Sequence, residues 1–99
     1  MAAPQPCPVS EEELHNEPLS PDKVRSLARW IIEYGTVVFS GHFYDQAKQR
    51  RCSEQDAHNV LRGGVASAGE WEGGSCRYKI STHRITIVVT FDAPYELVV

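Results

Sequence analysis

The chain has 99 residues, a formal net charge of −3 and 41% hydrophobic residues, which fits one small domain with a modest core. It has no run of about 18 apolar residues to cross a membrane, and no basic region followed by an apolar stretch as in a secretory signal. Its three cysteines, Cys7, Cys52 and Cys76, match neither a disulfide framework nor a zinc site, so we expect a reduced, cytoplasmic protein without metal or cofactor.

The first 19 residues are rich in Pro and Glu and contain few large apolar side chains. Such a composition buries too little surface to order a segment, so residues 1–19 are predicted to be a flexible acidic leader. Residues 20–99 are predicted to form a single α+β domain. All 10 basic residues follow Asp22, whereas five of the 13 acidic residues lie within residues 1–22. The acidic leader can therefore mask a polyanion site on the body, or it can be a plain solvated tail.

The first secure element is a helix over residues 21–34. Ser20, Pro21 and Asp22 are a cap, a first-position proline and a first-turn acid, which together begin a helix. Apolar residues follow at helical spacing on one face, namely Val24, Leu27, Ala28 and Ile31. Gly35 ends the helix, and the β-branched and aromatic residues at 36–40 predict a strand.

Two short helices are predicted between His42 and Gly64, and they meet at Cys52. The first begins at His42 and carries a basic cluster at residues 48–51. The second begins with a capping box formed by Ser53 and Asp56. Its apolar stripe consists of Ala57, Val60 and Leu61.

The last third of the chain is predicted to be β-structure. Residues 65–72 form a weak strand in which Trp71 anchors the sheet, and residues 84–91 and 95–99 form two more strands. Residues 76–82 alternate, so Arg77 and Lys79 share one face while Tyr78 points into the core. We therefore expect an α+β fold in which N-terminal helices pack on one antiparallel sheet of about four strands.

This order of elements, with His42, Arg50 and Ser53 in register, resembles a family of small bacterial domains of unknown function that are grouped with toxins. The family pattern is a strand ending at His, then Ala-x-x-Arg-Met-x-x-Arg-Gly-Ile-Ser, a short helix and an antiparallel sheet. The family is distantly similar to the RelE-like and MqsR-like mRNA interferases of toxin–antitoxin pairs. The resemblance covers residues 36–99, with Gln46 standing where the family has Arg and Arg51 where it has Gly.

The resemblance implies a RelE-like fold and a metal-free endoribonuclease that acts on mRNA, with RNA and an antitoxin protein as partners. Such cleavage needs a base for the 2′-hydroxyl, cations for the charge on phosphorus and an acid for the leaving oxygen. The candidates for catalysis are His42, Arg77, Lys79 and His83. The candidates for binding nucleic acid are Lys48, Arg50, Arg51 and Arg84.

Each candidate has a simpler interpretation. His42 can act as a general base, bind phosphate at the start of a helix, or cap that helix and pack. The basic cluster at 48–51 can contact RNA, meet an acidic antitoxin, or be a solvated helix end.

Two further functions are also compatible with the sequence. The protein can be a non-catalytic interaction module of the same fold, which the acids Glu70 and Glu72 favour. It can also form a homodimer through an exposed final strand. Convergence of Arg77, Lys79 and His83 on one concave face would favour the enzyme.

Overall fold

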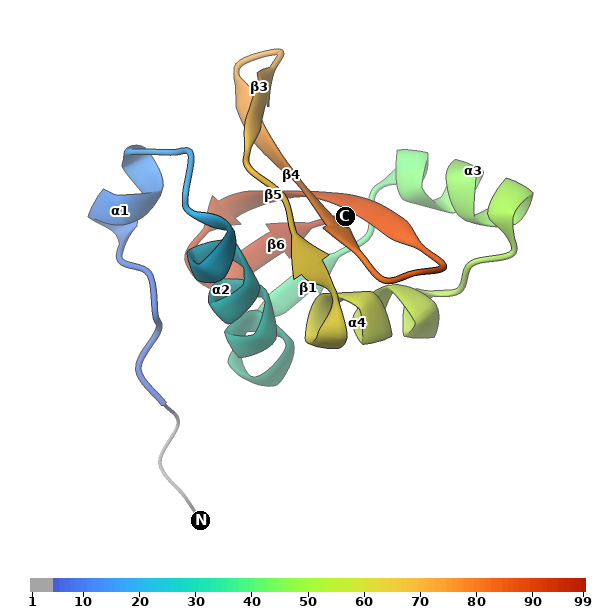
Figure 1. Ribbon diagram of the computed structural model, residues 1–99, viewed down its shortest axis with the longest axis horizontal. Helices are drawn as coiled ribbons and strands as arrows, with labels where there is room; N and C mark the ends of the chain where they lie inside the picture. The colour runs from blue at the N-terminus through green and yellow to red at the C-terminus, as the bar shows by residue number, and fades with distance from the viewer. Residues whose placement is uncertain (1–4) are drawn as a thin grey trace.

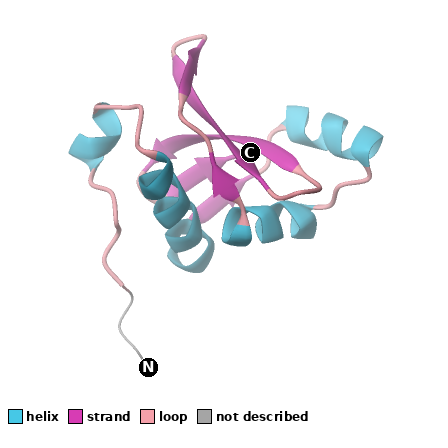
Figure 2. Ribbon diagram, in the orientation of Figure 1, coloured by secondary structure: helices cyan, strands magenta, loops and turns pink. Residues whose placement is uncertain are grey.

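The computed structural model describes residues 5–99 and contains four helices and six strands (Figures 1 and 2). The helices are α1 (Glu11–His15), α2 (Pro21–Tyr34), α3 (Gly41–Arg50) and α4 (Glu54–Gly63). The strands are β1 (Thr36–Val38), β2 (Val65–Ala66), β3 (Glu70–Glu72), β4 (Ser75–Ser81), β5 (Thr86–Ala93) and β6 (Glu96–Val98). None of the helices within residues 5–99 is long and apolar enough to cross a membrane.

The strands form one mixed sheet in the order β1-β6-β5-β4-β2, with β3 also paired to β4. β1 runs parallel to β6, whereas the other pairs are antiparallel. This corrects the expected antiparallel sheet of about four strands. The sequence pattern gives the positions of strands but not their partners. The parallel pair joins Thr36 to Glu96, which are neighbours in the sheet although they are far apart in the sequence. The expected strand over 65–72 is also split into two, β2 and β3.

The predicted helix ends are confirmed. Ser20 caps α2 by accepting a hydrogen bond from the Lys23 N–H. Ser53 and Asp56 form the capping box of α4, in which each side chain accepts a hydrogen bond from the other residue's N–H. Gly35 follows α2 where the chain passes the Tyr95 carbonyl, and a Cβ added there would collide with that oxygen.

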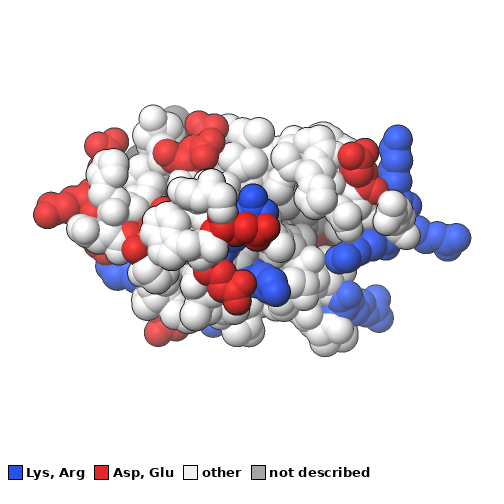
Figure 3. Space-filling model, turned by 90° about the horizontal axis from the view of Figure 1, so that it is seen from above, with Lys and Arg blue, Asp and Glu red and all other residues white. Residues whose placement is uncertain are grey.

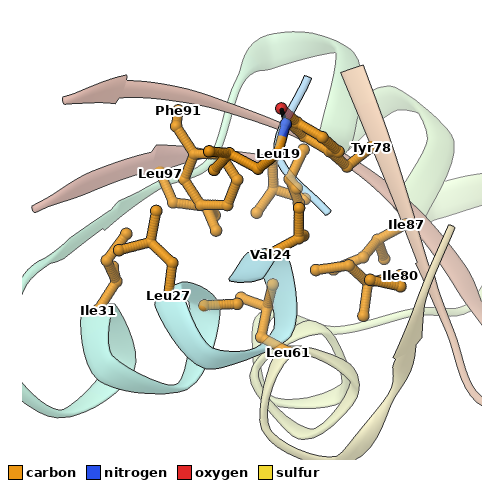
Figure 4. Packing of buried hydrophobic residues seen from close by; sticks show 14 of the residues in the cluster. Leu19, Val24, Leu27, Ile31, Leu61, Tyr78, Ile80, Ile87, Phe91 and Leu97 are labelled. Carbon is orange, nitrogen blue, oxygen red and sulfur yellow. Dashed lines mark hydrogen bonds between the residues drawn. The ribbon is translucent and has the colours of Figure 1, made fainter. Parts of the chain in front are cut away.

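The core lies between one face of the sheet and the helices α2 and α4. Figure 4 shows Val24, Leu27 and Ile31 of α2 pointing toward the strands. The strand residues that meet them are Tyr78, Ile80, Ile87, Phe91 and Leu97. Tyr78 is fully buried, as the alternation of β4 predicted. Trp71 is 59% exposed, so the expectation that it anchors the sheet is wrong, because the β3–β4 hairpin projects beyond the helices (Figure 1).

Within the predicted leader, three apolar side chains pack against the rest of the domain. Val9, Leu14 and Leu19 are buried in the common core. The Tyr78 hydroxyl accepts a hydrogen bond from the Leu19 N–H at 2.9 Å and donates one to the Glu17 carboxylate at 2.6 Å. The composition indicates how much apolar surface the segment can bury by itself. In the structure, the helices and strands of the domain supply most of the apolar surface against which these side chains pack. Residues 1–4 of the predicted leader lie outside the described residues.

Candidate functional site

The face of the sheet opposite α2 and α4 borders a hollow of about 880 Å³. The side chains that point to it alternate with the core residues of β4 and β5. α3 provides a second wall, because it lies to one side of the sheet instead of covering it (Figure 1). We call this hollow the groove; its wall and floor residues include His42, Gln46, Arg50, Arg77, Lys79, Arg84, Thr86, Val88, Thr90 and Val98.

The α3 wall presents His42, Gln46 and Arg50. These residues are four apart, so they lie above one another on one face of the helix, about 6 Å apart along its axis. Ser40 fixes the start of α3, since its hydroxyl accepts a hydrogen bond from the Phe43 N–H at 3.1 Å. The same hydroxyl donates to the Val99 carbonyl at 2.8 Å. The capped first turn, which carries His42, is therefore held beside the sheet.

The opposite wall is β4, which presents Arg77 and Lys79. Alternate residues of a strand lie about 7 Å apart on one face, so the two cations follow one another along the wall. Between this wall and α3 lie β5 and β6. Val88 sits opposite Lys79 in the β4–β5 register, and Thr90 sits opposite Val98 in the β5–β6 register. The floor of the groove is therefore a mixture of apolar and hydroxyl groups.

The groove carries an excess of positive charge although the chain is acidic. Arg50, Arg77, Lys79 and Arg84 line it together with two carboxylates, those of Glu70 and Glu72. Figure 3 shows Lys and Arg gathered at the right-hand end, where Figure 1 places α3, while most Asp and Glu lie toward the middle and the other end. A local excess of one charge attracts ligands of the opposite charge, so an anionic ligand fits this surface.

One of these cations is already paired. An oxygen of Glu72 lies 3.4 Å from a guanidinium nitrogen of Arg77, and both side chains are largely exposed. Exposed ion pairs contribute about 0–1 kcal/mol, so an incoming anion can displace Glu72 at little cost. Arg77 is therefore available to a ligand.

The structure brings some of the predicted site residues together and separates others. His42, Arg50, Arg77, Lys79 and Arg84 all line the groove. His83 is exposed in the turn between β4 and β5 and does not line it. Lys48 and Arg51 are exposed at the end of α3, also outside the groove. Arg51 follows the last turn of α3, and Lys48 does not share the helical face of His42 and Arg50.

Gln46 and the threonines of β5 are groove residues that the sequence interpretation missed. Gln46 was noted only as a departure from the family pattern. Its position four residues after His42 and four before Arg50 was the available signal. Thr86 and Thr90 share a face of β5 with Val88, which alternation alone could have shown.

Two other kinds of chemistry concern this region, namely metal binding and nucleophilic attack by cysteine. Within residues 5–99, no three His, Cys, Asp or Glu side chains gather in a way that could hold a metal ion. Burial, together with the nearby Asp56 carboxylate, raises the pKa of the Cys52 thiol, which lines the groove. Because the thiolate is the reactive form of cysteine, Cys52 is a poor nucleophile at neutral pH.

The proposed homodimer and the proposed masking by the leader do not fit the observed arrangement. β6 lies between β1 and β5, so the final strand has no free edge for a second copy. The acidic helix α1 lies at the other end of the molecule from α3 (Figure 1). The described part of the leader therefore does not cover the groove.

Comparison of the chain with protein-family models, characterised proteins and solved structures found no match. The functional interpretation therefore depends on the groove itself. Its main features are one imidazole, four cationic side chains, two carboxylates and a floor of apolar and hydroxyl groups.

Proposed function

We propose that the protein is a RelE-like toxin of a toxin–antitoxin pair, a metal-free endoribonuclease that acts on mRNA in the cytoplasm. One observation carries this proposal, namely that His42 shares a groove with Arg50, Arg77, Lys79 and Arg84. The groove thus combines a proton-transfer group with cations that can hold the phosphates of RNA. The resemblance to the toxin family, which consists of the order of elements and the register of His42, Arg50 and Ser53, is a second argument for the proposal.

The proposed reaction is attack of a 2′-hydroxyl on the adjacent phosphorus, with expulsion of the 5′-oxygen. His42 accepts the proton of the 2′-hydroxyl as general base. Arg77 and Arg50, on opposite walls, stabilise the negative charge that develops on the phosphate oxygens. Lys79 is the candidate acid that protonates the departing 5′-oxygen. The products are a 2′,3′-cyclic phosphate and a 5′-hydroxyl.

A non-catalytic interaction module is the second candidate, and two observations favour it. His83 lies outside the groove that Arg77 and Lys79 line, so these three side chains do not converge on one concave face. Glu70 and Glu72 line the same groove, and Glu72 pairs with Arg77. Carboxylates at this position oppose RNA binding, whereas a protein partner such as an antitoxin can use both signs of charge.

Inducible expression in a bacterial host tests the enzymatic proposal. We expect the wild-type protein to arrest growth and deplete total mRNA. His42→Ala and the double variant Arg77→Ala/Lys79→Ala should relieve both effects. His83→Ala is the matched control, because His83 is exposed outside the groove, and this variant should remain toxic.

Normal growth with intact mRNA, at good expression of folded wild-type protein, would contradict the enzymatic proposal and favour the interaction module. Equal relief by His42→Ala and His83→Ala would contradict the assignment of the groove as the site. Circular dichroism of each purified variant confirms that loss of toxicity is not loss of fold.

A further inference from the structure

Gln46 stands in the middle of the α3 wall, one turn after His42 and one turn before Arg50. Its side chain is partly buried in the groove, whereas Gln49 on the same helix is exposed and lies outside it. A ligand held in the groove between α3 and β4 would therefore meet Gln46 but not Gln49.

Gln46 places a hydrogen-bond donor and an acceptor side by side on one planar group, whereas the hydroxyls of Thr86 and Thr90 donate and accept at a single atom and the two nitrogens of His42 lie on different sides of its ring. Gln46 is the only carboxamide among the described residues of the groove, and a carboxamide presents donors and an acceptor in one plane. Arg77 and Lys79 can only donate, and Glu72 can only accept when ionised. The edges of nucleobases present donors beside acceptors, so Gln46 is the side chain best suited to read one.

The layout of the groove allows a nucleotide to reach from β4 to α3. The cations of β4 lie on one wall, and Val88 lies opposite Lys79 on the floor, with 43% of its surface exposed. A phosphate bound by Arg77 and Lys79 would direct the attached base across this apolar floor. The far side of the floor is the α3 wall, where the Gln46 carboxamide is.

We propose that Gln46 is a specificity-determining residue that recognises adenine in single-stranded RNA. Adenine presents the N6 donor beside the N7 acceptor, and a Gln carboxamide matches this pair with two hydrogen bonds. On this Hoogsteen edge guanine presents two acceptors, cytosine only a donor and uracil only an acceptor, so adenine is the base whose Hoogsteen edge satisfies both halves of the carboxamide. Watson–Crick edges do not discriminate in this way, because each presents a donor beside an acceptor, so the proposed contact is to the Hoogsteen edge. This inference rests on the proposed function, because it requires that the groove binds RNA.

Binding of labelled 2′-O-methyl oligonucleotides, measured by fluorescence anisotropy at one fixed salt concentration, tests the proposal. The blocked 2′-hydroxyl prevents cleavage, so binding is observed alone. The probes are hexamers of A, of U, of C and of 7-deazaadenine, which lacks the N7 acceptor. We expect wild-type protein to bind the A hexamer about 5- to 150-fold more tightly than the others.

Gln46→Ala should lose this preference and bind all four hexamers with similar, phosphate-driven affinity. Gln49→Ala should keep it, since Gln49 lies outside the groove. Gln46→Glu should move the preference toward C, because a carboxylate accepts from the N4 donor of cytosine.

The outcomes separate this inference from the proposed function. Equal binding of all four hexamers by wild-type protein, or a preference for A that survives Gln46→Ala, would overturn the role of Gln46 and leave RNA binding intact. Absence of binding to every hexamer would overturn both.

Discussion

At the scale of single residues, side chains that act on their near neighbours determine the helix ends and the two faces of β4. The alternation along β4 placed Tyr78 in the core and Arg77 with Lys79 on the other face. The caps Ser20 and Ser53 were equally predictable, because a cap bonds to an N–H three residues ahead. Trp71 was wrongly expected to anchor the sheet. Its exposure depends on how far the helices cover the sheet, which the sequence of its own strand does not show.

Arg51 holds the left-handed conformation that ends α3, with φ 52° and ψ 43°. A residue with a Cβ is strained there, whereas glycine is not. We expect Arg51→Gly to raise the free energy of unfolding by about 1 kcal/mol, measured by urea denaturation. Arg50→Gly, inside the helix, should lower it by about 1 kcal/mol. Destabilisation by both changes would contradict this interpretation of the α3 end.

The Tyr78 hydroxyl satisfies the buried N–H of Leu19 and holds Glu17. Tyr78→Phe leaves that N–H without a partner, which should cost about 1–2 kcal/mol of stability. Tyr95→Phe is the matched control, because Tyr95 is 56% exposed, and it should change stability by less than about 0.5 kcal/mol. Equal stability of the two variants in urea denaturation would show that the hydroxyl does not tie the leader to the sheet.

At the scale of elements, helix positions followed from the sequence, but strand partners did not. The 3.6-residue period and the caps are local, so α2, α3 and α4 appeared close to their predicted bounds. The parallel pairing of β1 with β6 is long-range and depends on how the whole chain folds back. The packing of the leader on the core did not follow from the sequence for the same reason, because its buried residues need the rest of the domain.

The leader should contribute to stability as part of the core. Leu14 of α1 is buried, so Leu14→Ala is expected to lower the free energy of unfolding by about 2 kcal/mol, at the low end for core leucines. Glu12→Ala, on the exposed side of the same helix, should have an effect below about 0.5 kcal/mol. If chemical denaturation finds no difference between these variants, the leader is detached in solution.

The start of α4 should make stability depend on pH. The hydrogen bond from the Ser53 N–H to the carboxylate, together with the adjacent Ser53 side chain, lowers the pKa of Asp56 below its ordinary value of 3.8. The contribution of this group is therefore complete above about pH 5 and is lost as the pH falls through the lowered pKa. Asp56→Asn should be less stable than wild type at pH 6, and the difference should shrink as the pH falls below 3.8. An offset that stays constant over this range, measured by thermal or urea unfolding, would contradict the ionic role.

At the scale of the whole molecule, the groove is a product of assembly. The sequence predicted that Arg77 and Lys79 share a face, but it could not show that α3 stands beside that face. It also did not show that His83 turns away while Arg84 lines the groove. The resulting surface is cationic within a chain of net charge −3. The central claim is that this groove binds RNA and that His42 starts its cleavage.

Incubation of purified protein with single-stranded RNA in the presence of EDTA tests this claim most directly. Wild-type protein is expected to cut the RNA and leave 2′,3′-cyclic phosphate and 5′-hydroxyl ends. His42→Ala should slow cleavage by about 10²- to 10⁴-fold, as expected for a lost general base, whereas His83→Ala should cut at the wild-type rate. No cleavage by folded wild-type protein, or equal rates for the two histidine variants, would contradict the claim.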